Sequence, residues 1–404
     1  MEALPRQRLL VLAGCDDARL DDLEQRQIIG PGVHGYSLSD VSRLRLILAL
    51  QDAGIGPDIL AEGLRRKIFS FEFASQVMFE PVSMTSASVA DEVAAGTVDL
   101  DTLNGLRASA SLPPLSAERS LREDDLEFVR LIAECMQLGA SAAGMERVLR
   151  VFGHSVRRCV DTMRDLFRAE VEEPMLNAGL SYHHLLEISA AKRLALQRIG
   201  FRVLFLLQRR MLEEAVFDNI VGRLQDALRE HGLEPEDEDS LPAVAFADLS
   251  GFTGLTHEIG DAPAAEKAAR FEAIAQRLSC SFDGRIVKPL GDGVMMLFPD
   301  AASAVEASLS LVEQSRECDL PPVRVGVATG QVVPRDGDIF GRTVNLAARV
   351  SAVAGPSQTL VCLNTRTAAE AAVRGLAFQG LGAVSLKGFK DSVPLFAAQR
   401  RTSG

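Results

Sequence analysis

The chain has 404 residues and a net charge of −12, from 55 acidic and 43 basic side chains. At about 150 residues per domain, this length predicts two or three domains. An acidic chain with no tryptophan and two tyrosines lacks the clustered cations and aromatic platforms on which nucleic-acid binding depends. We therefore expect no nucleic-acid partner.

The N-terminal residues and the cysteines indicate the compartment. Leu9 to Cys15 resembles a lipoprotein cleavage site, but its apolar stretch is shorter than a secretory signal needs, which favours a plain strand or loop. No apolar run approaches the roughly 18 residues that cross a bilayer. The six cysteines are scattered and match neither a zinc site nor a disulfide framework. We expect a cytoplasmic protein with reduced thiols and no membrane partner.

Residues 1–181 predict a helical domain, because apolar residues recur at spacings of three and four. Within them, segments 45–65 and 130–150 look alike: each reads as an apolar helix, a glycine (Gly54 or Gly139) and a second helix. This weak repeat favours helical hairpins that pack on one another. A DNA-binding helix–turn–helix is the alternative, but it needs a basic face that this half of the chain does not offer.

Residues 182–231 predict one very long helix or two stacked helices, since an apolar stripe continues from Leu194 to Leu224. Such a segment can couple two domains or hold a dimer together, and a plain core helix of the first domain is an equal alternative. His183 and His184 lie near its start. They could provide a pH input, although two surface histidines are the simpler interpretation.

Residues 232–241 predict an acidic linker, because a glycine and a proline there accompany a run of acids. After it, residues 242–404 alternate short β-branched runs with alanine-rich helical runs, which is typical of α/β or α+β folds. A strand over 244–249 delivers Asp248 at its end and runs into a turn of small residues. A carboxylate in that position can serve as a metal ligand beside backbone N–H groups.

A second acid follows from a hairpin. The run 285–290 leads into Gly291-Asp292-Gly293, which predicts a turn with Asp292 at its tip. If this hairpin pairs beside the first strand, Asp248 and Asp292 meet. Two carboxylates can hold a pair of Mg²⁺ ions on a triphosphate.

The third block adds groups that handle phosphates. It begins with a strand over 323–328 and continues to a helix that carries Asn345 and Arg349. These two residues are four apart, so they share one face of the helix. An amide and a guanidinium near paired carboxylates form a wall suited to phosphate groups.

Three blocks of sequence, FADLSGFT, LGDGVMMLF and GDIFGRTVNLAAR, resemble the catalytic domain of class III nucleotidyl cyclases in order and spacing from Ala243 onward. The resemblance implies an α+β chain, in which an all-α regulatory domain precedes a ferredoxin-like α/β sandwich. It also implies an adenylate cyclase, which converts ATP to 3′,5′-cyclic AMP and pyrophosphate by attack of the ribose 3′-oxygen on the α-phosphorus. The helical first half is similar in architecture to the autoregulated cyclases of mycobacteria.

The resemblance implies a role for each matching residue. Asp248 and Asp292 would bind two Mg²⁺ or Mn²⁺ ions, which activate the 3′-hydroxyl and offset phosphate charge. Asn345 would position the ribose, and Arg349 would stabilise charge on the α-phosphoryl group. Backbone groups of the turn would help to hold metal and phosphates: Leu249, Phe252 and Thr253.

Two further positions imply the choice of base. Lys288 and Asp338 match the lysine and aspartate with which the family reads adenine. Adenine offers an acceptor at N1 and a donor at N6, whereas guanine reverses that pattern. Each unpaired polar group would cost about 1–3 kcal/mol. ATP is therefore the expected substrate.

One departure concerns the terminal phosphates. Some members bind them with an arginine on the strand after the helix that carries Arg349, but the strand over 357–362 contains none. Lys387 or Lys390 resembles the family's lysine near the C-terminus, and either could serve the triphosphate. Solvated lysines at a strand end are the alternative.

The resemblance also implies a homodimer, because the family's pocket lies between two subunits. The two aspartates would come from one chain, and the adenine-reading pair, Asn345 and Arg349 from the other. Since this chain carries both sets, a homodimer would hold two complete sites. A catalytically idle nucleotide-binding module that signals by dimerising is the rival interpretation.

Overall fold

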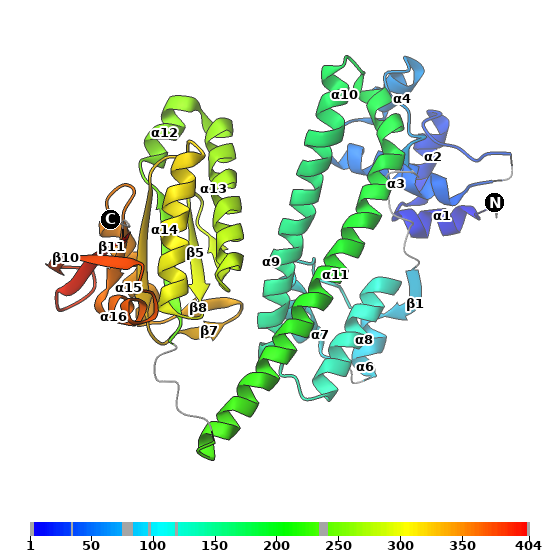
Figure 1. The fold of residues 1–404 in the computed structure, drawn as a ribbon. Coiled ribbons are helices and arrows are strands. Elements are labelled where there is room, and N and C mark those ends of the chain that lie inside the picture. Colours follow the sequence, from blue (N-terminus) through cyan, green and yellow to red (C-terminus); the bar gives the residue numbers. More distant parts are fainter. Residues whose placement is uncertain are drawn as a thin grey trace. The chain divides into compact units, whose positions relative to one another are not determined.

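The computed structural model describes residues 4–33, 35–74, 84–95, 98–117, 120–233 and 241–401 (Figure 1). The chain forms two compact units, Met1–Gly222 and Arg223–Gly404. The predicted linker, residues 232–241, lies for the most part outside the described residues. No helix in the described ranges is long and apolar enough to span a membrane.

The first unit begins with four helices that share one core. They are α1 (Arg6–Ala13), α2 (Asp17–Gln25), α3 (Leu38–Asp52) and α4 (Pro57–Arg65). Buried leucines from all four helices meet in this core: Leu9, Leu20, Leu23, Leu44 and Leu60. The strand or loop expected at Leu9–Cys15 is therefore wrong. The segment is helical because it buries Leu9 and Leu12 three residues apart, and Gly14 (φ 70°) ends the helix in the left-handed conformation.

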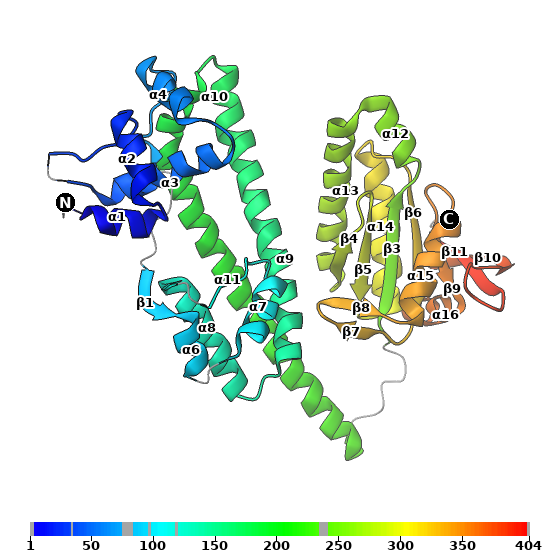
Figure 2. The same ribbon diagram turned by 180° about the vertical axis from the view of Figure 1, so that it is seen from behind.

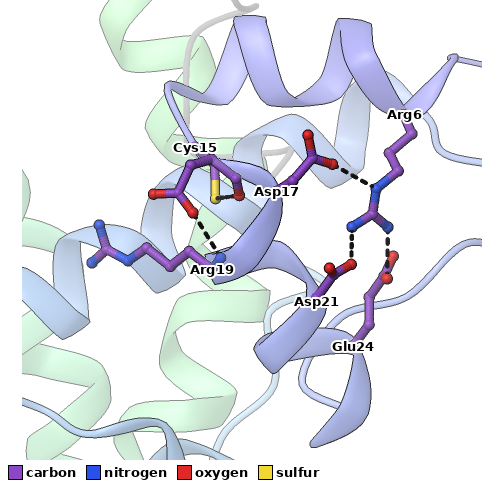
Figure 3. A network of polar contacts seen from close by, with 7 residues as sticks. Arg6, Cys15, Asp17, Arg19, Asp21 and Glu24 are labelled. Atoms are coloured by element: carbon purple, nitrogen blue, oxygen red, sulfur yellow. Dashed lines mark hydrogen bonds and ion pairs between the residues drawn. The ribbon is translucent and has the colours of Figure 1, made fainter.

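An ion cluster joins α1 to α2 on the surface of this unit (Figure 3). Arg6 donates to Asp17 (3.2 Å), to Glu24 (2.6 Å) and to Asp21. The hydrogen bond to Glu24 contributes most to raising the pKa of Arg6. Exposed ion pairs contribute about 0–1 kcal/mol each, so the buried leucines dominate the stability of this region.

A second core follows in the first unit. Its elements are β1 (Met84–Ser88), α6 (Val89–Ala94), α7 (Leu100–Ser109), β2 (Ser120–Arg122), α8 (Glu123–Gln137) and α9 (Ala142–Phe167). Strands β1 and β2 pair in antiparallel fashion, so the helical first half also contains a small two-stranded sheet. These strands are too short to show an alternating pattern in the sequence.

The two predicted helix–glycine–helix segments are confirmed as α3–α4 and α8–α9. Gly54 (φ 90°) and Gly139 (φ 97°) take the left-handed backbone conformation between the helices of each pair. The second helix of the second pair continues to Phe167, well beyond the similar segments. A π-helical turn, η1 (Arg168–Glu172), and α10 (Glu173–Asn177) follow it.

Residues Tyr182–Glu230 form one continuous helix, α11, of 49 residues. Its first part is held against the end of α9, where Arg193 pairs with Glu172 (2.7 Å) and lies 4.0 Å from the ring centroid of Phe167. Further along, large apolar side chains are exposed, including Phe201, Phe205, Met211, Phe217 and Leu224. The start of α11 is therefore packed into the first unit, whereas its later residues expose large apolar side chains. His184 Nδ1 lies 2.8 Å from the Ser181 hydroxyl, and the His183 side chain is outside the described residues.

The second unit contains the expected ferredoxin-like sandwich (Figure 2). Four strands of its sheet run in the order β6-β3-β5-β4, with β4 at the edge, and neighbours among these four pair in antiparallel fashion. These strands are β3 (Ala243–Leu249), β4 (Arg285–Pro289), β5 (Gly293–Phe298) and β6 (Val323–Thr329). The connections run through α12 (Phe252–Ile259), α13 (Asp261–Ser281) and α14 (Ala301–Glu317). This part of the predicted fold is confirmed.

Three further strands extend the sheet beyond β6, in the order β9, β11 and β10. They are β9 (Thr359–Cys362), β10 (Leu376–Val384) and β11 (Val393–Arg400). The remaining elements are β7 (Val333–Arg335), β8 (Asp338–Phe340), α15 (Arg342–Val353) and α16 (Leu363–Ala372). Together these elements place the third sequence block beside the first two.

The alternation of side chains along β3 gives the sheet two buried faces. Ala243, Ala245 and Ala247 join the core that includes residues of α13 and α14, whereas Val244 joins a core with Ala347 of α15. Helix α15 lies close to β6 because Gly326 has no side chain. A Cβ at this position would lie 2.6 Å from the carbonyl oxygen of Ala347. This close contact fixes the position of α15.

Candidate active site

Asp248 and Asp292 lie at adjoining strand ends, as the sequence predicts. Asp248 stands opposite Gly293 in the β3–β5 register. The Leu249 N–H donates to the carbonyl oxygen of Asp292 (3.0 Å), and Gly291 (φ 86°) makes the turn between β4 and β5. The backbone therefore brings the two acidic residues to one edge of the sheet.

An arginine that the sequence interpretation missed contacts the first acid. Arg324 stands opposite Asp248 in the β3–β6 register, and its Nε donates to Asp248 Oδ2 (2.9 Å). Both side chains line a pocket of about 250 Å³. The sequence did mark this residue as unusual, since Arg324 is the single charge in an otherwise apolar strand. Only the strand order shows that it meets Asp248.

The surroundings of Asp248 fit a divalent cation. A Cβ on Gly293 would lie 3.3 Å from Asp248 Oδ1 and 2.8 Å from the Ala247 carbonyl oxygen, so glycine keeps space beside the carboxylate. The nearby Ser250 hydroxyl is buried without a hydrogen-bond partner. Two carboxylates suit Mg²⁺, which keeps several positions for water and phosphate. Among the described residues, no group of three His, Cys, Asp or Glu side chains forms a closed metal cage.

The turn after β3 places the other residues of the first block. Phe252 and Thr253 begin α12, and they line a second pocket of about 510 Å³ together with Asp292. The role expected for these residues, which is to help to hold metal and phosphates, stays a prediction.

Lys288 and Asp338 form an ion pair, although 50 residues separate them. Asp338 also accepts a hydrogen bond from the Ile339 N–H (2.8 Å). Burial acts to raise the pKa of Asp338, but the hydrogen bonds from Lys288 and Ile339 outweigh it and lower the pKa. A carboxyl whose pKa is lowered loses its charge only as the pH falls through that lower value. The Asp338 carboxylate therefore stays charged throughout the neutral range.

A third pocket, of about 960 Å³, contains the predicted phosphate-handling residues. Asn345 and Arg349 line it from α15, and Lys387 and Lys390 line it from the loop before β11. Both lysines line this pocket, so their position does not show which of them would serve the triphosphate. The strand after α15 is β9, and it carries no arginine.

The candidate residues thus fall into separate groups within one chain. Asp248 lines one pocket, Asp292 lines a second and Arg349 lines a third. The adenine-reading candidates meet each other directly. These are two carboxylates at a sheet edge and a cationic helix face, which are the groups that phosphoryl chemistry requires.

Comparisons with known proteins find sequence relatives of this part of the chain. Residues 236–399 match the adenylate and guanylate cyclase catalytic domain family. An adenylate cyclase of Streptomyces coelicolor is 32% identical over 249 residues, which are 60% of this chain and 61% of that protein. A pH-sensitive adenylate cyclase of Mycobacterium tuberculosis is 38% identical over 160 residues, which are 39% of this chain and 40% of that protein. The chain thus matches about three fifths of the Streptomyces relative's length.

A solved structure, that of the adenylyl cyclase CyaB from P. aeruginosa, is 23% identical and has a TM-score of 0.36. It covers 41% of this chain and 97% of the other. The strand order of the second unit and the match of residues 236–399 agree in their resemblance to a nucleotidyl cyclase catalytic domain.

Proposed function

We propose that the chain is an adenylate cyclase, which converts ATP to 3′,5′-cyclic AMP and pyrophosphate. The observation that carries the choice of base is the ion pair between Lys288 and Asp338. A lysine can donate to adenine N1, and a carboxylate can accept from the N6 amino group. Guanine would present an N–H to the lysine and a carbonyl to the carboxylate. The relatives that are named adenylate cyclases support the same substrate.

Asn345 and Arg349 act on the reacting part of the nucleotide. Asn345 positions the ribose, so that the 3′-oxygen faces the α-phosphorus. Arg349 stabilises the charge that develops on the α-phosphoryl group during in-line attack. Within the described residues, no carboxylate lies within 4.0 Å of its guanidinium, which leaves the group available for a phosphate.

Asp248 and Asp292, with the backbone of Leu249, would hold two Mg²⁺ or Mn²⁺ ions. When bound, such ions neutralise phosphate charge and favour deprotonation of the 3′-hydroxyl. Arg324 also donates to the Asp248 carboxylate, at Oδ2. Once that carboxylate has another partner, Arg324 can bind the terminal phosphates, for which β9 offers no arginine.

The active site is shared between two copies of the chain. The aspartates of one copy face the α15 residues and the adenine-reading pair of the other. The absence of both Asp248 and Asp292 from the pocket that Arg349 lines supports this arrangement, because a second copy can join groups that one chain keeps apart.

The domain boundaries complete the proposal. Residues 1–181 form a regulatory domain, and residues 182–231 couple it to the catalytic domain, which covers 242–404. The 249-residue match to the Streptomyces protein is longer than the family's range in this chain, so the likeness extends beyond the catalytic domain.

Deletion of residues 1–232 tests regulation. An unchanged rate and pH profile would contradict it.

The central test is an assay of the purified full-length chain with ATP or GTP, in the presence of Mn²⁺ or Mg²⁺. We expect cyclic AMP from ATP and little cyclic GMP from GTP. Binding of ATP without turnover would instead support an idle nucleotide-binding module. Preferential use of GTP would overturn the assigned base.

A further inference from the structure

Arg342 is a cation of the large pocket to which the sequence interpretation gave no role. It is the first residue of α15, three residues before Asn345 and seven before Arg349. Residues at these spacings lie on one face of a helix. All three line the same pocket of about 960 Å³, so the face that carries the two predicted residues extends by one turn to Arg342.

The charge of this pocket is strongly positive. Four cations line it, Arg342, Arg349, Lys387 and Lys390, against the single acid Asp391. In the part of the chain that the structure describes, none of the four lies within 4.0 Å of a carboxylate. By contrast, Arg324, Arg366 and Arg400 of the same unit are paired with acids. In a protein of net charge −12, an uncompensated cluster of this kind fits a polyanionic ligand.

Phe389 fixes the position of Arg342. The guanidinium carbon lies 5.8 Å from the centroid of the Phe389 ring, within the range of a cation–π contact. Phe389 stands between Lys387 and Lys390 in sequence, so this contact joins the lysine loop to α15. The N–H donors of a guanidinium lie in its plane. A ring that contacts the face of the guanidinium therefore leaves these donors available to bind a phosphate in bidentate fashion.

From this arrangement we infer that Arg342 is a further substrate-binding residue, which binds the phosphate chain of the nucleotide and is positioned by Phe389. The inference rests on the proposed function in one respect, because it takes the phosphate chain of a nucleoside triphosphate as the natural ligand. The pocket's chemistry alone requires only a di- or triphosphate group.

Binding of inorganic pyrophosphate with Mg²⁺ tests the inference without turnover. Calorimetry on the full-length chain would compare the wild type with Arg342→Gln and Arg342→Lys. We expect Arg342→Gln to weaken binding about tenfold, which corresponds to about 1.4 kcal/mol. Arg342→Lys should recover part of the loss, because it keeps the charge without the bidentate geometry. In the cyclase assay, Arg342→Gln should raise KM for ATP by a similar factor and change kcat less than twofold.

Arg366→Gln is the matched control. Arg366 also lies over an aromatic ring, 4.6 Å from the centroid of Phe396, but it pairs with Glu370 and does not line the pocket. Its replacement should leave pyrophosphate binding unchanged. The inference is overturned if Arg342→Gln binds pyrophosphate like the wild type, if the control weakens binding equally, or if the wild type binds none.

The outcomes separate this inference from the proposed function. A chain that forms no cyclic AMP, yet binds pyrophosphate in an Arg342-dependent way, would refute the cyclase activity and keep the role of Arg342. A chain that forms cyclic AMP, with KM and pyrophosphate binding indifferent to Arg342→Gln, would refute the role of Arg342 alone.

Discussion

Arg324 on β6 and Asp248 on β3 are register partners on adjacent antiparallel strands, and the Nε of Arg324 donates to Asp248 Oδ2 at 2.9 Å. The candidate metal ligand is therefore paired with a cation of its own chain. A divalent cation at this site would compete with Arg324 for the charge of this carboxylate, of which Arg324 contacts Oδ2. Under the proposed function, the ion pair would link occupation of the metal site to the release of Arg324 for phosphate binding.

Arg324→Gln tests this link. Removal of the competing guanidinium should strengthen the binding of Mn²⁺ alone, by a few-fold for a half-exposed pair worth up to about 1 kcal/mol. The rate of cyclic AMP formation should nevertheless fall about tenfold or more, since a contact to the phosphates is lost. Calorimetric Mn²⁺ titration and a cyclase assay measure the two effects. Weaker Mn²⁺ binding in the variant would contradict competition between arginine and metal.

Gly326→Ala tests whether the close contact between β6 and α15 positions the site. The new methyl group would meet the Ala347 carbonyl oxygen at 2.6 Å, so α15 must shift. Overpacking of this kind costs about 1–3 kcal/mol, and displacement of Asn345 and Arg349 should lower kcat. Thermal unfolding and the cyclase assay provide the readouts. Gly380→Ala on β10 is the control, because its nearest neighbour is an ordinary 3.7 Å contact with Phe396.

Reversal of the Lys288–Asp338 pair tests base selection. Lys288→Glu combined with Asp338→Lys keeps opposite charges at the two positions but exchanges donor and acceptor. Preference should move from ATP toward GTP, with a change in the ratio of kcat/KM of about tenfold or more, since two mismatches are relieved for guanine and created for adenine. Each single variant should impair both substrates. A double variant that retains the full preference for ATP would show that other groups read the base.

Mixed dimers test the shared site. Asp248→Ala and Arg349→Ala should each be nearly inactive alone. In an equal mixture after subunit exchange, half of the dimers are mixed and each restores one of two sites, so about a quarter of the wild-type activity should return. Co-expression of the two variants controls for slow exchange. Failure to recover activity under both conditions would contradict a site built from two chains.

Arg193→Ala tests the attachment of α11 to the end of α9. The variant loses the pair with Glu172 (2.7 Å) and the contact with the Phe167 ring, and it leaves a half-buried carboxylate unpaired. We expect a loss of about 1–3 kcal/mol in the stability of the first unit. Arg209→Ala is the control on the same helix, because its exposed pair with Glu213 (3.0 Å) contributes at most about 0.5 kcal/mol. Equal losses would exclude a specific anchor at Arg193.

Local patterns in the sequence were sufficient for much of the fold. Short β-branched apolar runs and a Gly-Asp-Gly turn predicted β3, β4 and β5, because backbone geometry at strands and tight turns depends on neighbouring residues. The segment Leu9–Cys15 was misjudged for the opposite reason. Its helix depends on burial against α2 and α3, which no local pattern records.

The charge balance of the sequence predicted that the chain has no nucleic-acid partner, and the resemblance of three motifs to class III cyclases implied a nucleotide chemistry. Tertiary structure decided which charges meet. Arg324 reaches Asp248 because antiparallel pairing sets residues 76 apart opposite each other. Arg342 gathers with Arg349 and two lysines because a loop far along the chain folds against α15. Sequence determines such groups only through strand order and helix packing, so an acidic chain can hold a cationic pocket that its composition conceals.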